Sequence, residues 1–452
     1  MAKPFPKRLN HVIFLGAGAS YTSGYPIGQK LRLMMASKDY FQAELDKIYP
    51  TTNSMTDAPL HDGKIKCLQY FDRFAKSIEL FRHGGFATVD EFSKLASESY
   101  PEHVQAMKKL MCFVLAAHNP EKDFHESDYY AFIQRLFRND ALNHFRNEIT
   151  VITFNYDCYL DYVMRQAYSY RSAVSKVSEV VKNHPDVLKS PQPLTEPWSS
   201  KLSSGFFEQD SDKTLAWRVD QFNYFKLHGS IAYGGVPANF SYDELFVQAA
   251  PKRFEFLNDD WFVNSYVPPV VFPWELFDPA SGNFISEDDF IFVKGKNQEG
   301  KKLFSHFKIM WENAKLSVER ADKISFVGLS MHDYLEGGLR FLFQEFGKSK
   351  DPKTRGWIAE GTMDEAKPKR VEVVVANPDN NQFKNAENRL HPSSLCGRVA
   401  DLLKKVAPNL AYVRSSSEND GIFRSTDTPD KTEDPDITPR YSFKEFIERE
   451  MD

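Results

Sequence analysis

Two short polar segments carry side chains that can do chemistry. Residues 153–157 (Thr-Phe-Asn-Tyr-Asp) contain Asn155 and Asp157, and residues 226–230 (Lys-Leu-His-Gly-Ser) contain His228. A histidine titrates near neutrality and suits a general base, while an asparagine amide can hold a ribose hydroxyl or a water molecule. The alternatives are a structural histidine and an Asp157 that caps the next helix, and neither segment alone chooses between them.

A glycine-rich turn, Gly16 to Ser20 (Gly-Ala-Gly-Ala-Ser), lies near the start of the sequence. Small residues let a backbone approach a pyrophosphate, and the amino end of a following helix supplies amide donors. The third glycine of the dehydrogenase pattern G-x-G-x-x-G is absent, because Tyr21 follows Ser20. The turn therefore indicates either a nucleotide-binding loop without that pattern or an ordinary tight turn.

Short apolar runs must position these residues. The runs that predict strands are His11–Leu15, Glu148–Phe154, Asn223–Leu227, Lys323–Val327 and Val371–Ala376. Helical segments are expected at 29–36, 159–167 and 335–346, so short strands alternate with helices. This alternation predicts an α/β fold, a Rossmann-like parallel sheet with helices on both faces.

Polar or glycine-rich turns follow all five predicted strands. Gly328 and Ser330 come after the fourth strand, and Asn377 comes after the fifth. An open parallel sheet binds its ligand beyond the carboxyl ends of its strands. We therefore expect the five turns to lie at one edge of the sheet.

The rest of the chain is predicted to insert into or extend this domain. Residues 38–147 have aromatic residues at helical spacing, which predicts a largely helical insertion, and residues 183–220 are rich in Pro, Ser and Lys, which predicts a loop insertion. We expect one domain over residues 1–414. Residues 415–452 are expected to form a polar tail or surface loop with a short terminal helix.

Composition argues against several classes of partner and leaves only a local basic patch open. The 57 basic and 62 acidic residues nearly balance, so no overall positive field attracts nucleic acid or an anionic membrane. No apolar run approaches the roughly 18 residues that span a bilayer. The four cysteines lie far apart and form no Cys-x-x-Cys pair, so no zinc site is expected. These features predict a soluble, cytoplasmic protein that contacts neither nucleic acid nor membrane directly and holds no metal.

Taken in order, the segments resemble the motif set of the sirtuins. The set runs from Gly-Ala-Gly-Ala-Ser and Ser-Gly-Tyr-Pro (residues 23–26) through Thr-x-Asn-x-Asp, Leu-His-Gly and Gly-x-Ser to a late strand ending in Asn, over about residues 10–380. The forms at 153–157 and 226–230 look more like the bacterial sirtuin-like NAD hydrolases of anti-phage defence than the protein deacylases. Deacylase sirtuins carry two zinc-binding cysteine pairs after the histidine, whereas no cysteine occurs here from residue 159 to residue 395. Their Pro-Asp-Phe-Arg sequence is also replaced, by Pro-Ile-Gly-Gln at residues 26–29.

The resemblance implies an NAD hydrolase that cleaves NAD, its substrate, to nicotinamide and ADP-ribose without a metal. It implies that Asn155 and His228 are the catalytic residues. The residues that it implies for NAD binding are Gly16, Ala17, Gly18, Ser20, Pro26, Asp157, Gly328, Ser330 and Asn377.

By analogy with the defence family, the resemblance also implies how the enzyme is used. It implies an abortive-infection effector that forms a homo-oligomer and depletes NAD when a partner activates it. A translocase-type ATPase or a short Argonaute is the kind of separate regulatory protein expected. Two alternatives use the same site: an NAD-dependent ADP-ribosyltransferase or deacylase, and a non-catalytic sensor of NAD or ADP-ribose. The sequence does not choose among them.

Overall fold

A computed structural model provides the structure of the chain. The parts that it describes are residues 9–21, 23–26, 28–48, 65, 68–69, 71–86, 88–117, 124–137, 146, 148–157, 159–160, 163, 167, 223–230, 270–278, 281–290, 298–329, 335–344, 370–376, 398–399, 401, 403, 405, 411–413, 437–440 and 442–451.

One parallel sheet organises these residues. Its strands are β1 (His11–Leu15), β2 (Ile149–Thr153), β3 (Asn223–Lys226), β4 (Lys323–Val327), β5 (Arg370–Ala376), β6 (Ala411–Val413) and β7 (Ile437–Arg440). They are ordered β3-β2-β1-β4-β5-β6, with β7 also on β5, and every pair is parallel. The chain builds outward from β1 to β3 and then returns past β1 to β4. The strand order therefore reverses between β1 and β4, which is the topological switch point of a Rossmann-like sheet.

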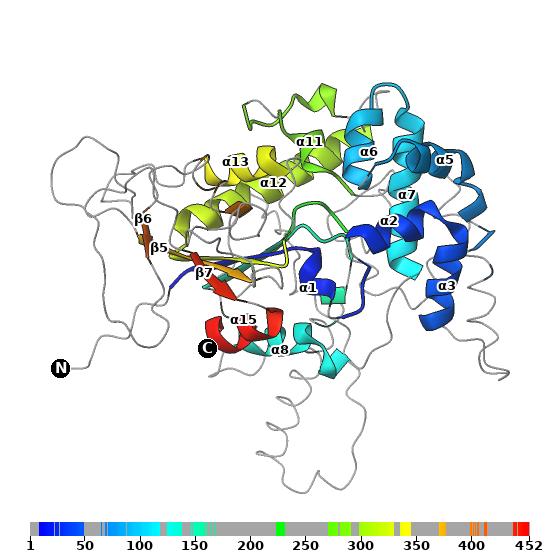
Figure 1. The fold of residues 1–452 in the computed structure, drawn as a ribbon. Coiled ribbons are helices and arrows are strands. Elements are labelled where there is room, and N and C mark those ends of the chain that lie inside the picture. Colours follow the sequence, from blue (N-terminus) through cyan, green and yellow to red (C-terminus); the bar gives the residue numbers. More distant parts are fainter. Residues whose placement is uncertain are drawn as a thin grey trace, which may run out of the picture.

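Both faces of the sheet are apolar, and helices cover both. Along β1, Ile13 and Leu15 enter one hydrophobic core, while Val12 and Phe14 enter a second core. Helices α8 (Asp128–Leu136) and α15 (Phe443–Glu450) contribute to the first core, and α12 (Gln298–Arg320) and α13 (Glu336–Phe343) contribute to the second. Figure 1 shows these two pairs of helices on opposite faces. The predicted α/β class is thus confirmed, because strands buried on both sides must be apolar throughout.

A helical layer precedes β2, as the sequence predicted. The helices are α2 (Gly28–Ala36), α3 (Lys38–Ile48), α5 (Ala75–His83), α6 (Val89–Ala96), α7 (Pro101–Ala117) and the short 3-10 helix η2 (Phe124–Glu126). Helix α6 starts at an N-cap, in which the Thr88 hydroxyl accepts a hydrogen bond from the Glu91 amide at 3.1 Å. None of the described helices is long and apolar enough to cross a membrane. The predicted loop insertion at 183–220 lies outside the described residues.

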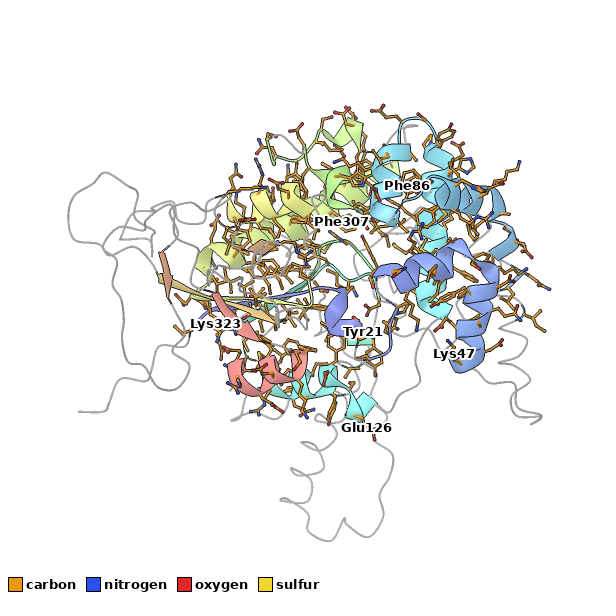
Figure 2. All side chains as sticks on the ribbon, in the orientation of Figure 1. Tyr21, Lys47, Phe86, Glu126, Phe307 and Lys323 are labelled. Atoms are coloured by element: carbon orange, nitrogen blue, oxygen red, sulfur yellow. The ribbon has the colours of Figure 1, made fainter. Side chains whose placement is uncertain are left out.

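The helical layer lies beyond the carboxyl ends of the strands. In Figure 2, Lys323 marks the amino end of β4, and Tyr21 marks the end of α1 (Ala17–Tyr21), the short helix that directly follows β1. Helices α2, α3, α5, α6 and α7 are gathered on the α1 side of the sheet (Figure 1). The edge at which an open parallel sheet binds ligands therefore faces the helical insertion.

The C-terminal segment is part of the fold, so the boundary expected at residue 414 does not separate it from the sheet. Strand β7 pairs with residues 373–376 of β5, and the terminal helix α15 packs on α8, where the rings of Phe443 and Tyr129 are 5.4 Å apart. Strand β7 has only four residues, and Pro439 is one of them. A proline is tolerated on an edge strand, but in a segment rich in polar residues it argues against predicting a strand. Residues 414–436 lie outside the described residues.

Candidate functional site

The turns after β1 and β4 interlock at the switch point. The amide of Gly16 donates to the carbonyl of Val327 at 2.9 Å, and the amide of Gly18 donates to the carbonyl of Gly328 at 2.8 Å. A Cβ atom added to Gly16 would lie 2.4 Å from the Cα of Leu329, and Gly328 has a φ of +58°. Glycine is required here because the two backbones touch and because one of them adopts a left-handed conformation.

This packing narrows the role that the glycine turn can have in binding a phosphate. The amides of Gly16 and Gly18 are already donated to carbonyls of the β4 turn, and the amide of Ala19 donates to Gly16 at 3.0 Å. Ala17, at the start of α1, is exposed. A phosphate bound to this turn therefore has to meet the exposed start of α1. The binding of NAD by the predicted loop residues stays a prediction.

Asn155 joins the end of β2 to the turn after β1. Its side chain is buried, and Nδ2 donates to the carbonyl oxygen of Gly16 and to Oγ of Ser20, each at 3.0 Å. Its backbone amide donates to the Thr153 hydroxyl at 3.1 Å, and that hydroxyl donates to the Leu15 carbonyl at 3.1 Å. No described residue donates to Oδ1 of Asn155. This oxygen is therefore the part of the side chain left to accept a bond from a ligand or a water molecule.

Ser20 and Asp157 complete a buried network beside Asn155. The Ser20 hydroxyl donates to Oδ2 of Asp157 at 2.8 Å and lies 2.9 Å from the hydroxyl of Tyr129, on α8. The other carboxylate oxygen, Oδ1, accepts from the amide of Tyr159 at 3.1 Å. Of the two roles considered for Asp157, the structure contains the cap, because this contact satisfies a backbone amide at the start of the next helical turn. The carbonyl of Asp157 also accepts from Nζ of Lys226, at the end of β3.

His228 follows β3 and is packed between aromatic rings. It is 4% exposed, and its ring centroid lies 5.0 Å from that of Phe154 and 5.5 Å from that of Tyr156. Desolvation by burial lowers the pKa of His228 to about 3, although a hydrogen bond with the Phe154 backbone opposes this shift. The imidazole is therefore neutral at neutral pH. Its Nε2 atom has no hydrogen-bond partner among the described residues.

A second group of polar residues lies where the helical insertion meets these turns. The Tyr156 hydroxyl donates to Oδ1 of Asp90, on α6, at 3.2 Å. Lys108, on α7, pairs with Glu275 at 2.5 Å, and both side chains are fully buried. Glu275 belongs to α11 (Pro273–Leu276), and its Oε2 also accepts from the amide of Phe272 at 2.7 Å. Burial raises the pKa of Asp90 to about 6 and is the largest influence on it.

Sequence reasoning missed several of these residues. Tyr129 lies in the aromatic stretch 128–137, whose helical spacing predicts only a buried face. Tyr156 could have been found from the sequence, because it stands between Asn155 and Asp157 in the 153–157 segment. Asp90 and Lys108 lie within the helical insertion, where no motif separates them from ordinary surface charges.

The structure brings some of the predicted site residues into contact with one another. Gly16, Ser20, Asn155 and Asp157 form one hydrogen-bonded network, and His228 follows the adjacent strand without a hydrogen bond to Asn155. Pro26 is buried in the turn before α2. Ser330 and Asn377 lie outside the described residues.

The fold and the placement of these turns define a Rossmann-like α/β protein with polar residues at its switch point. The chain matches no protein-family model and no curated protein sequence. Among the described residues, no group of three or more His, Cys, Asp and Glu side chains is placed to hold a metal ion.

Proposed function

We propose that this chain is an NAD hydrolase that cleaves NAD to nicotinamide and ADP-ribose. One observation carries the proposal: Asn155 and His228 follow the adjacent strands β2 and β3, and Asn155 is bonded to the turn after β1, at the switch point. Sheets of this kind bind nucleotides at this place. The ordered resemblance of the segments to sirtuin-like NAD hydrolases supports the same reaction.

The proposed reaction breaks the bond between the nicotinamide nitrogen and C1′ of the ribose. Nicotinamide leaves with the bonding electron pair and so loses its positive charge, which means that it needs no proton from an acid. A water molecule forms the new bond to C1′. We assign Oδ1 of Asn155 the role of orienting this water or a ribose hydroxyl, and Nε2 of His228 the role of accepting the proton.

The burial of His228 sets a condition on this mechanism. A neutral imidazole has a free electron pair for a proton, but a base with a pKa of about 3 holds that proton weakly. Polar groups of a bound substrate next to the ring would replace part of its lost solvation and raise its pKa. The proposal therefore requires a substrate-bound arrangement in which Nε2 contacts polar atoms.

The remaining NAD contacts are proposed by position. The exposed start of α1 at Ala17 would meet the pyrophosphate, Pro26 would lie in the loop that follows, and Asp157 would lie near the nicotinamide ribose. Gly328, Ser330 and Asn377 follow β4 and β5 and would lie on the adenosine side.

We further propose that the enzyme acts in the cytoplasm as an abortive-infection effector of anti-phage defence. A constantly active NAD hydrolase would exhaust the NAD of its own cell, so activity must wait for a signal. The apolar packing around His228 supports a resting state of this kind. Oligomer assembly, or a partner such as a translocase-type ATPase or a short Argonaute, would supply the signal.

Labelled NAD tests the reaction. The purified chain, alone and with each candidate partner, is incubated with NAD labelled in both halves, and free nicotinamide, free ADP-ribose and label on macromolecules are measured. We expect equal release of nicotinamide and ADP-ribose, and loss of both in Asn155→Ala and His228→Ala. The matched control is His83→Ala, because His83 is an exposed histidine at the end of α5.

Three outcomes contradict the proposal. Label retained on protein or nucleic acid indicates a transferase. Binding of NAD without turnover, with every candidate partner present, indicates a sensor. Nicotinamide release that is unchanged in both Asn155→Ala and His228→Ala removes these residues from the mechanism.

A further inference from the structure

Tyr156 connects the helical insertion to His228. Its ring stacks on the imidazole, with the centroids 5.5 Å apart and the planes inclined by 27°. At the far end of the same side chain, the hydroxyl donates to Oδ1 of Asp90 at 3.2 Å. The ring of Phe272 meets Tyr156 edge-on, at 5.9 Å and 90°. One side chain thus spans the distance from the first turn of α6 to the candidate base.

Asp90 is itself held in place. It lies in the first turn of α6, which is capped by Thr88, and its neighbours Val89 and Phe92 are buried. The carboxylate is near the positive end of the helix dipole, which favours an acceptor at this position. The Tyr156 hydroxyl therefore bonds to a fixed acceptor.

The turns around His228 are anchored to the same insertion by a second contact. Nζ of Lys108 donates to the Val270 carbonyl at 3.2 Å, and Val270 forms an antiparallel bridge with Gly229, the residue after His228. Lys108 also pairs with Glu275, which binds the amide of Phe272. Helices α6 and α7 therefore hold the backbone and one ring face around the histidine.

Apart from Tyr156, His228 contacts the backbone and the ring of Phe154. A hydrogen bond with the Phe154 backbone restrains one part of the ring, and the Phe154 ring is inclined to it by 57°. Nε2 meets no hydrogen-bonding group among the residues described. The Tyr156 ring lies more nearly parallel to the imidazole than the Phe154 ring does, at 27° against 57°, so it packs on the face of the imidazole.

We propose that Tyr156, anchored by Asp90, is a positioning residue that sets the ring plane of His228 and so the direction of Nε2. The catalytic part of this inference rests on the proposed NAD hydrolysis, whereas the structural part does not. A supporting residue of this kind matters because a misplaced catalytic group loses much of its effect, on the order of 100-fold in rate for about 1 Å.

Four variants distinguish the effect of the Tyr156 ring from the effect of its hydrogen bond to Asp90. Tyr156→Leu removes the stacked ring, Tyr156→Phe keeps the ring without its hydroxyl, and Asp90→Ala removes the acceptor. Asp90→Asn is the conservative variant, because an amide oxygen can still accept from the Tyr156 hydroxyl. Tyr100→Phe is the matched control, since Tyr100 is 47% exposed and lies outside the site.

The first measurement does not depend on any activity. The full-length chain is labelled with ¹³C at the histidine rings, and the His228 resonance is assigned with His228→Gln. We expect ring currents to displace this resonance in the wild type, and we expect it to move in Tyr156→Leu. Smaller movements are expected in Tyr156→Phe and Asp90→Ala, with the wild-type position restored in Asp90→Asn and kept in Tyr100→Phe.

The second measurement is the rate of NAD cleavage under activating conditions. We expect Tyr156→Leu to lower kcat by about tenfold or more with a smaller change in KM, and Asp90→Asn to retain most of the kcat that Asp90→Ala loses. Circular dichroism and thermal melting show whether Tyr156→Leu folds. If it does not, the kcat values of Tyr156→Phe and Asp90→Ala test the positioning role, because both variants keep the Tyr156 ring and lose its hydrogen bond.

The outcomes distinguish the two proposals. A His228 resonance and a kcat that are both unchanged in Tyr156→Leu overturn the positioning role. A resonance that moves as expected, in a protein that never cleaves NAD, keeps the positioning of His228 and rejects the proposed function. Unchanged kcat together with a moved resonance overturns the catalytic part of the inference.

Discussion

Asn155 donates its side-chain amide to the carbonyl oxygen of Gly16, 3.0 Å away, and so joins the turn after β2 to the turn after β1. The same amide group bonds to Ser20, whose hydroxyl donates to Asp157. The residue proposed to orient a water molecule is therefore also a structural link at the switch point. Any loss of activity on its replacement has to be separated from a loss of stability.

The dual role of Asn155 gives a first prediction. Asn155→Ala removes the donor and leaves the Gly16 carbonyl and the buried Ser20 hydroxyl short of one partner each. We expect the free energy of unfolding to fall by about 1–3 kcal/mol, measured by urea denaturation. Asn283→Ala, at an exposed site, is the control and should change stability by less than about 0.5 kcal/mol. Equal stability in both variants would show that the two bonds of Asn155 contribute nothing net.

The close contact between the β1 and β4 turns gives a second prediction. In Gly16→Ala, the new Cβ would lie 2.4 Å from the Cα of Leu329, so one backbone must move. We expect a loss of about 1–3 kcal/mol in thermal or urea unfolding, because such overpacking shifts backbone atoms. Gly28→Ala is the comparison, since no atom lies within 4 Å of its added Cβ and only its φ of +49° is strained. A Gly16→Ala protein as stable as Gly28→Ala would contradict the close contact.

Much of the sheet could be predicted from sequence because its strands are short apolar runs. The bounds of β1 and β4 agree with prediction, and those of the other three predicted strands differ by one residue at an end or at both ends. A strand buried on both faces consists of continuous apolar residues, and such a run can be recognised in a sequence. Strands β6 and β7 were not predicted, because β6 has only three residues and the four residues of β7 are of mixed polarity.

The candidate site was predictable only at its strand ends. The fold class determines that the turns after β1 and β2 meet, so Gly16 and Asn155 could be expected to lie close together. The partners Tyr129 and Asp90 come from helices, whose spacing shows which face is buried but not what that face touches. The low pKa of His228 was also hidden, since it depends on the rings of Phe154 and Tyr156 around it.

Two buried histidines give a third prediction, on pH. Burial lowers the pKa of His228 to about 3, and burial is also the main reason that the pKa of His11 is well below 6.5. As pH falls below 6.5, the unfolded chain binds these protons while the folded chain does not, so stability falls with pH. For His228 this loss extends from about pH 6.5 down to about pH 3.

Urea unfolding from about pH 7.5 to about pH 4.5, on both sides of the ordinary histidine pKa, checks this linkage. Replacing His228 by asparagine removes one titrating group, so the slope of stability against pH should decrease, by about 1.4 kcal/mol per pH unit at the acidic end of this range, where the unfolded histidine is protonated. His83→Asn, at an exposed position, should leave the slope unchanged. A slope that is the same in wild type and in His228→Asn would mean that His228 titrates normally in the folded chain.

The buried ion pair between helices α7 and α11 gives a fourth prediction. Lys108 and Glu275 have fully buried side chains, so Lys108→Met leaves a carboxylate without its counter-ion. We expect a loss of about 3–5 kcal/mol in urea unfolding at neutral pH, because an unpaired buried charge is poorly solvated. Adding Glu275→Gln should recover much of this loss, since glutamine carries no charge and its amide oxygen can still accept from the Phe272 amide.

Lys301 supplies the matched control for this pair. It bonds to Asp288, whose side chain is 84% exposed, so Lys301→Met should cost less than about 1 kcal/mol. If the double variant of Lys108 and Glu275 were no more stable than Lys108→Met alone, the uncompensated charge would not be the cause of the loss. The contact of Lys108 with the Val270 carbonyl, which both variants lack, would then account for it, and the ion pair itself would contribute little to anchoring the insertion at His228.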